Sequence, residues 1–105
     1  MGASMVDAFL AHGDARGVDA WIAVGMLIDF SRDPRQPVLD VLAERDFPEA
    51  LASGKLRSGR LPSDRCSKSL LISGTDHYFE SAAAPLAAAS EEFLSRVFEG
   101  ACARP

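Results

Sequence analysis

The longest apolar stretch of the chain covers residues 18–30 and is interrupted only by Asp19, Gly25 and Asp29. Its length favours a helix, because strands usually run to about 4–8 residues, and this helix would be apolar on every side. Several β-branched residues within the stretch favour a buried strand instead. We therefore expect a central buried helix with Trp21 anchored in the core, and a long buried strand is the alternative.

Two more segments show apolar residues at helical spacing. Residues 5–12 follow Ser4, which can cap a helix, and we expect a short amphipathic helix there. Residues 37–45 carry a second apolar face. Met1 to Ser4 precede a second methionine and resemble an expression remnant, so no prediction rests on them.

The best helix start signal lies at residues 46–49. Asp46 can cap, Pro48 suits the first turn, and Glu49 is placed to close a capping box. These residues predict a short helix that stops near Gly54. The glycines, serines and proline of residues 54–65 predict a loop outside the core.

The clearest helix lies near the C-terminus and ends at Gly100, a residue type that favours helix ends. Its apolar residues form one stripe: Leu86, Phe93, Leu94, Val97 and Phe98. Residues 69–80 fit either a small β-hairpin or two helix ends that meet at Asp76, and the sequence leaves both open.

These segments together predict a mainly α fold. We expect one globular helical domain over residues 1–105, a small bundle of about five helices around residues 21–30, with a possible short β-hairpin near residues 69–80. A helix that is apolar on all sides needs cover, and a second subunit could supply part of it. We therefore expect a homodimer, the commonest oligomer.

Charge is distributed unevenly along the chain. The whole sequence holds 11 bases and 15 acids, yet residues 55–68 hold five bases and one acid, Asp64. The five bases are Lys55, Arg57, Arg60, Arg65 and Lys68. The sequence thus predicts a positive loop on a negative body.

We expect this loop, or an exposed apolar helix face, to be the binding surface of a small non-enzymatic regulatory protein. Its partner would be an acidic protein surface or a small anionic ligand, because arginines bind carboxylates and phosphates. A nucleic-acid-binding regulator that uses the same loop is one alternative. The net charge of −4 and the absence of aromatic residues between the bases make it the weaker one.

A small enzyme or accessory subunit that uses His77 or Cys66 is the other alternative. Asp76, His77 and Tyr78 bring an acid, an imidazole and a phenol together, and Cys66 has basic neighbours that could lower its thiol pKa. We assign no catalytic residue, metal ligand or cofactor, because the two histidines are far apart in sequence and no metal-binding spacing of cysteines occurs.

The same residues set expectations for the compartment. Cys66 and Cys102 are expected to be free thiols, because a domain of this size needs no disulfide to fold. The apolar run of residues 18–30 is shorter than the roughly 20 residues that span a bilayer, and no leader-like segment is evident. We therefore expect a soluble cytoplasmic protein with no membrane partner.

Overall fold

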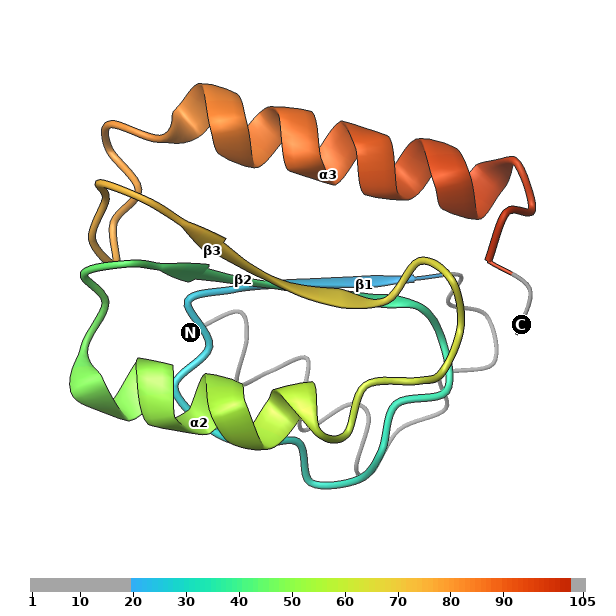
Figure 1. Ribbon diagram of the computed structural model, residues 1–105, viewed down its shortest axis with the longest axis horizontal. Coiled ribbons are helices and arrows are strands. Elements are labelled where there is room, and N and C mark those ends of the chain that lie inside the picture. The colour runs from blue at the N-terminus through green and yellow to red at the C-terminus, as the bar shows by residue number, and fades with distance from the viewer. Residues whose placement is uncertain (1–19, 103–105) are drawn as a thin grey trace.

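The computed structural model describes residues 20–102, and its central element is a sheet of three parallel strands (Figure 1). The strands are β1 (Trp21–Val24), β2 (Val38–Ala43) and β3 (Lys68–Ile72), and their order across the sheet is β1-β2-β3. In the register of the sheet, Val38 of β2 pairs with Trp21 and Leu39 pairs with Lys68.

Two helices cover opposite faces of this sheet, as Figure 1 shows. Helix α2 (Pro48–Ser58) connects β2 to β3, and helix α3 (Ala83–Phe98) follows β3. Residues 25–37 connect β1 to β2 without a helix and lie on the α2 side of the sheet. The described residues therefore form three layers, α/β/α.

The alternation of β2 divides the core between these layers. Leu39 and Val41 join a cluster on the α3 side that includes Phe93, whereas Val38 joins a cluster with Met26 on the α2 side. All six residues of β2 are buried. A central parallel strand is covered on both faces, and its side chains are therefore apolar almost throughout.

The expected bundle of about five helices is wrong, because a small α/β fold with a parallel sheet takes its place. Residues 37–45 read as an apolar face because both faces of β2 are buried. In residues 18–30 the described part begins with β1 and then turns at Gly25, whose φ is +63°. Trp21 is therefore a half-buried strand residue, and its indole Nε1 donates a hydrogen bond to Gln36.

Residues 69–80 form neither of the two structures expected for them. β3 ends at Ile72 and pairs with β2, which lies far away in the sequence, and the residues after it are turns. A strand that pairs in parallel needs a distant partner, and local turn chemistry gives no sign of it.

The two helices predicted after Asp46 and near the C-terminus are both present. Helix α2 begins with Pro48 in its first turn. Helix α3 buries Phe93, although Phe98 of its stripe is 73% exposed, and it ends at Phe98, two residues before Gly100, whose φ is +73°. Helix α2 does not stop at Gly54 but continues to Ser58. A Cβ on Gly54 would lie 2.2 Å from the Leu42 side chain, so this glycine lets the helix approach the sheet.

The expected helix at residues 5–12 lies outside the described residues. Neither of the two helices in residues 20–102 has the length and apolar character needed to cross a membrane.

A buried ion pair joins α2 to the central strand. The Arg57 side chain is 0% exposed, and its Nε donates to Asp40 Oδ2 at 2.8 Å. Its Nη1 donates to the carbonyl of Ile28 and to Ser53 Oγ, and that hydroxyl donates in turn to the carbonyl of Met26. Burial raises the pKa of the Asp40 carboxyl above its ordinary value, and the hydrogen bond and the charge of Arg57 offset only part of this rise.

Replacing Arg57 with alanine should strand the Asp40 carboxylate in the core. We expect Arg57→Ala to lower the free energy of unfolding by about 3–5 kcal/mol at neutral pH. The unpaired carboxyl then has a pKa above its unfolded value, so the loss should shrink as the pH falls and Asp40 takes up a proton. Urea unfolding at several pH values measures this, with Lys55→Ala on the exposed side of α2 as the control. A loss independent of pH would contradict the ionic explanation.

The two cysteines are bonded, contrary to the expected free thiols. Cys66 lies just before β3 and Cys102 just after α3, and their sulfur atoms form a disulfide across 36 residues of sequence. Cys66 is buried in the cluster that α3 covers. The bond therefore ties the far end of α3 to the start of β3.

Removing this bond should loosen α3. In the chain-entropy description, a loop of this length corresponds to about 3–4 kcal/mol. We expect the double variant Cys66→Ser/Cys102→Ser to unfold at a lower temperature than the oxidised protein, and reduction of the native chain to have the same effect. Mass spectrometry after alkylation, with and without reductant, counts the thiols. Alkylation of both cysteines in unreduced protein would show that the bond does not form.

Candidate functional site

The turns that follow the three strands meet at one end of the sheet, where the strands finish. Because the strands are parallel, their carboxyl ends lie together there, and ligands of open α/β sheets bind at that edge. Gly25 follows β1, Asp46 follows β2, and His77 lies in the turns after β3. The fold thus brings together residues that are distant in the sequence.

Asp46 has a side chain that is 0% exposed. Its Oδ1 accepts a hydrogen bond from the Phe47 amide at 2.8 Å and lies 2.9 Å from His77 Nδ1. Its Oδ2 is buried and has no hydrogen-bond partner among the described residues. The carboxylate predicted to cap α2 therefore binds an imidazole, and α2 begins without a side-chain cap.

His77 is held from several sides and remains 26% exposed. Phe47 stacks on its ring, with centroids 4.9 Å apart, and Tyr78 meets it edge-on at 5.5 Å. Behind the ring lies Gly25, where a Cβ would come within 3.1 Å of Nδ1. With Asp46 ionised, Nδ1 carries the hydrogen, so Nε2 is the atom that can accept a proton.

A carboxylate that orients a partly exposed imidazole is an arrangement suited to acid–base chemistry. It fixes the tautomer of the ring and stabilises the imidazolium that forms when Nε2 takes a proton. Two residues that precede this pair in the sequence, Arg45 and Asp76, line a hollow of about 210 Å³. The other residues that line it are Gly74, Thr75, Glu80 and Ser81. Thr75 Oγ1 is buried and has no hydrogen-bond partner in the described part of the chain.

The five predicted binding residues do not form one loop. Lys55 is exposed on α2, and Lys68 is exposed at the start of β3. Arg57 is the buried partner of Asp40, so it lies in the core and not on a loop outside it. Arg65 is exposed in the segment before β3, and Arg60 is half-buried just after α2.

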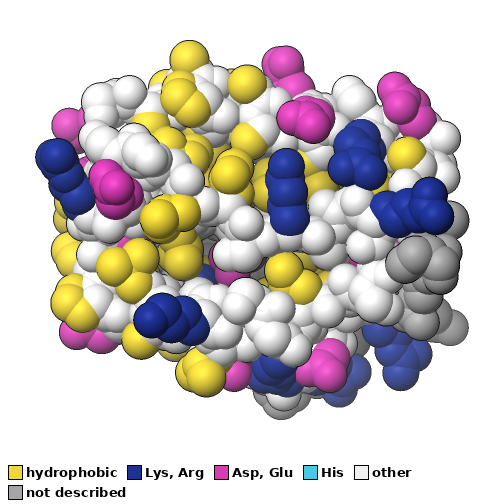
Figure 2. Space-filling model, viewed as in Figure 1, with side chains coloured by type: hydrophobic (Ala, Val, Ile, Leu, Met, Phe, Trp, Pro, Cys, Tyr) yellow, Lys and Arg dark blue, Asp and Glu magenta, His cyan; other side chains and the backbone are white. Residues whose placement is uncertain are grey.

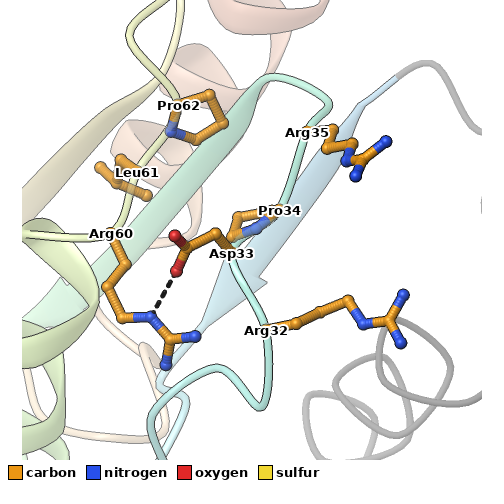
Figure 3. Close-up of a pocket in the computed structure, with 7 residues that line it drawn as sticks. All are labelled: Arg32, Asp33, Pro34, Arg35, Arg60, Leu61 and Pro62. Carbon is orange, nitrogen blue, oxygen red and sulfur yellow. Dashed lines mark hydrogen bonds and ion pairs between the residues drawn. The ribbon is translucent and has the colours of Figure 1, made fainter.

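Arg60 lines a hollow of about 660 Å³ at the opposite end of the sheet, where the strands begin (Figure 3). Its Nε donates to Asp33 at 2.7 Å and its Nη1 lies 3.2 Å from Asp29, and the bond to Asp33 raises the pKa of the guanidinium. Figure 3 shows Arg32 and Arg35 pointing away from this pair. The arginine charges therefore do not converge on one ligand position.

The sequence singled out His77 but not its partner. Asp46 carried a signal that was misinterpreted: an acid shortly after a buried strand is also how a site at the carboxyl edge of a parallel sheet begins. Cys66 is in the disulfide and is no thiol nucleophile in this state. Within residues 20–102 no three His, Cys, Asp or Glu side chains form a group suited to a metal ion.

Comparison with known proteins adds no assignment: no protein-family model, curated protein or solved structure matches this chain.

Gly25 and Gly74 allow the packing against His77 to be tested. Both have positive φ, but only a Cβ on Gly25 meets the imidazole, whereas one on Gly74 meets nothing within 4 Å. We expect Gly74→Ala to cost about 1–2 kcal/mol through backbone strain alone. Gly25→Ala should cost more and should shift the His77 ring resonances in NMR spectra. Equal costs, with His77 unmoved, would show that this close approach does not hold the ring.

Proposed function

We propose that this chain carries an acid–base catalytic site, in which Asp46 orients His77 and His77 Nε2 takes a proton from a hydroxyl group. The observation that supports this is the 2.9 Å contact between a fully buried carboxylate and a partly exposed imidazole at the carboxyl edge of a parallel sheet. The enzymatic alternative for His77 is therefore the one that the geometry favours.

The reaction class that fits is transfer of an acyl group to a hydroxyl or to water. As the hydroxyl oxygen attacks the carbonyl carbon, its proton passes to Nε2, and the imidazolium then returns a proton to the leaving oxygen. The exposed rings of Phe47 and Tyr78 border this position and suit an apolar substrate group. Water is the simplest nucleophile, and it turns an ester into an acid and an alcohol.

Replacing His77 tests this function directly. With p-nitrophenyl acetate as the probe, we expect His77→Gln to lower the rate of ester hydrolysis about 100-fold or more, the lower end of what a general base supplies. His12→Gln is the matched control, because it removes the other histidine of the chain. Equal hydrolysis by His77→Gln and the native chain would rule out a catalytic role for this residue.

A second measurement reads the site without any substrate. Long-range ¹H–¹⁵N spectra distinguish the two neutral tautomers of histidine, and we expect His77 to carry its hydrogen on Nδ1. Asp46→Asn should shift the ring toward the Nε2–H tautomer, because the amide can donate a hydrogen bond to Nδ1. A native ring with its hydrogen on Nε2 would remove the basis for a general base at that atom.

Binding of an acidic protein surface or a small anionic ligand is the second candidate function. Three of the predicted binding residues, Lys55, Arg65 and Lys68, are exposed, and the ion pairs between described residues do not include them. They support contact with an anionic partner across the surface more than a single binding pocket. The nucleic-acid alternative depends on the same residues and gains nothing from the burial of Arg57.

Compartment and oligomeric state also remain proposals. The cytoplasmic location expected from the sequence assumed reduced cysteines, and a Cys66–Cys102 disulfide favours an oxidising compartment instead. The homodimer was inferred from a central helix, and the described part of residues 18–30 holds a strand and turns instead. A homodimer would therefore have to form through another surface of the protein.

A further inference from the structure

Phe79 has a backbone conformation that is unusual for an aromatic residue. Its φ is +55°, and among the described residues it is the one residue other than glycine with a positive φ. This left-handed region brings the Cβ of an L-residue too close to the following carbonyl oxygen, so a bulky residue keeps it only where the surrounding structure holds it there. His77, the imidazole of the candidate site, lies two residues earlier in the chain.

Phe79 joins two consecutive turns. Its amide donates to the carbonyl of Asp76 at 3.1 Å, so His77 and Tyr78 are the two central residues of the first turn. The Ala82 amide donates to the carbonyl of Phe79, also at 3.1 Å, and closes the second turn just before α3. The conformation at Phe79 therefore sets how the turn that carries His77 is oriented relative to α3.

The Phe79 ring is buried and supplies the hold that this conformation needs. It is 7% exposed and belongs to the cluster between α3 and the sheet, together with Ile72 of β3 and Phe93 of α3. Figure 2 shows hydrophobic side chains between α3 and the sheet, the layer to which this cluster belongs. An aromatic ring makes one of the largest apolar contributions of any side chain when it leaves water. Burial of the ring thus offsets the unfavourable backbone conformation.

The imidazole has to meet a partner that a different part of the chain holds. Asp46 lies in the turn between β2 and α2, and Figure 1 shows this turn at the same end of the sheet as the connection from β3 to α3. His77 Nδ1 lies 2.9 Å from Asp46 Oδ1, and a Cβ on Gly25 would lie 3.1 Å from the ring. Contacts this close tolerate little displacement of the turn that carries His77.

We propose that Phe79 is a positioning residue for His77, because its buried ring holds the left-handed conformation that presents the imidazole to Asp46. The Phe79 side chain lies in the core and acts only through the turn. An alanine at this position would keep the unfavourable φ and lose the anchor, so the turn should relax and carry the imidazole away from Asp46. This inference rests on the function proposed for His77, although the position of the ring can be measured without any activity.

NMR spectra of the native protein provide the first test. A positive φ brings the amide and α protons of a residue close together, so Phe79 should show a strong cross-peak between its own two protons. Its ring protons should also show cross-peaks to Ile72 or Phe93, its neighbours in the core cluster. A weak cross-peak within Phe79, or a ring without these core contacts, would overturn the proposal before any variant is made.

Substitution of Phe79 provides the second test, with the tautomer of His77 as the readout in long-range ¹H–¹⁵N spectra. In Phe79→Ala we expect the preference for Nδ1–H to be lost and both tautomers to appear. Phe79→Leu keeps an apolar anchor and should retain the native tautomer. Phe30→Ala is the matched control, because Phe30 is 5% exposed in the cluster on the α2 side and its carbonyl binds Arg60 at the opposite end of the sheet. It should lower the melting temperature and leave the His77 tautomer unchanged.

Ester hydrolysis separates this inference from the proposed function. With p-nitrophenyl acetate as the probe, Phe79→Ala should lower kcat about tenfold or more and change KM less than about threefold, because a displaced base costs rate while the buried ring contacts no substrate. If His77→Gln hydrolyses the ester as fast as the native chain, the proposed function fails, and the tautomer still reports where His77 lies. A native tautomer in folded Phe79→Ala, its loss in Phe79→Leu, or an equal loss in Phe30→Ala would each refute the positioning role.

Discussion

The buried pair of Arg57 and Asp40 is the interaction on which the other parts of this structure depend. Asp40 lies in the middle of the central strand, and its carboxylate would be very costly in an apolar core without a partner. Arg57 neutralises it and uses its remaining donors on Ser53 and the carbonyl of Ile28. One guanidinium thereby holds three separate segments: β2, α2, and the long connection between β1 and β2.

That clamp also explains how the turns at the carboxyl edge of the sheet are held in place. With β2 and α2 fixed to each other, the short turn between them has little freedom, and Asp46 lies within it. The connection held by Arg57 begins at Gly25, directly behind the His77 ring. The disulfide acts in the same way at the opposite edge, where it ties α3 to the start of β3. The Asp46–His77 pair therefore lies among elements that are each anchored at a second point.

The sequence predicted the elements that local chemistry determines and missed those that depend on distant partners. Pro48 marked the start of α2, and the stripe containing Phe93 with Gly100 defined α3, because these signals lie within one or two turns of helix. β2 read as a helix face because a strand buried on both sides lacks the polar–apolar alternation that identifies half-buried strands. Its paired residues lie 17 positions away along the chain in β1 and 29 positions away in β3, and no local pattern records that pairing.

The candidate site shows the same division, with a further difficulty. His77 was visible as a residue type, but a carboxylate at position 46 is equally suited to cap a helix or to orient an imidazole, and only the fold decides between the two. The bases of residues 55–68 were misjudged for a related reason. Charge counted along the chain does not show that Arg57 turns inward to a carboxylate while Lys55, two residues earlier, faces solvent. On a helix these two positions lie on different faces, so a window that adds their charges combines a core interaction with a surface charge.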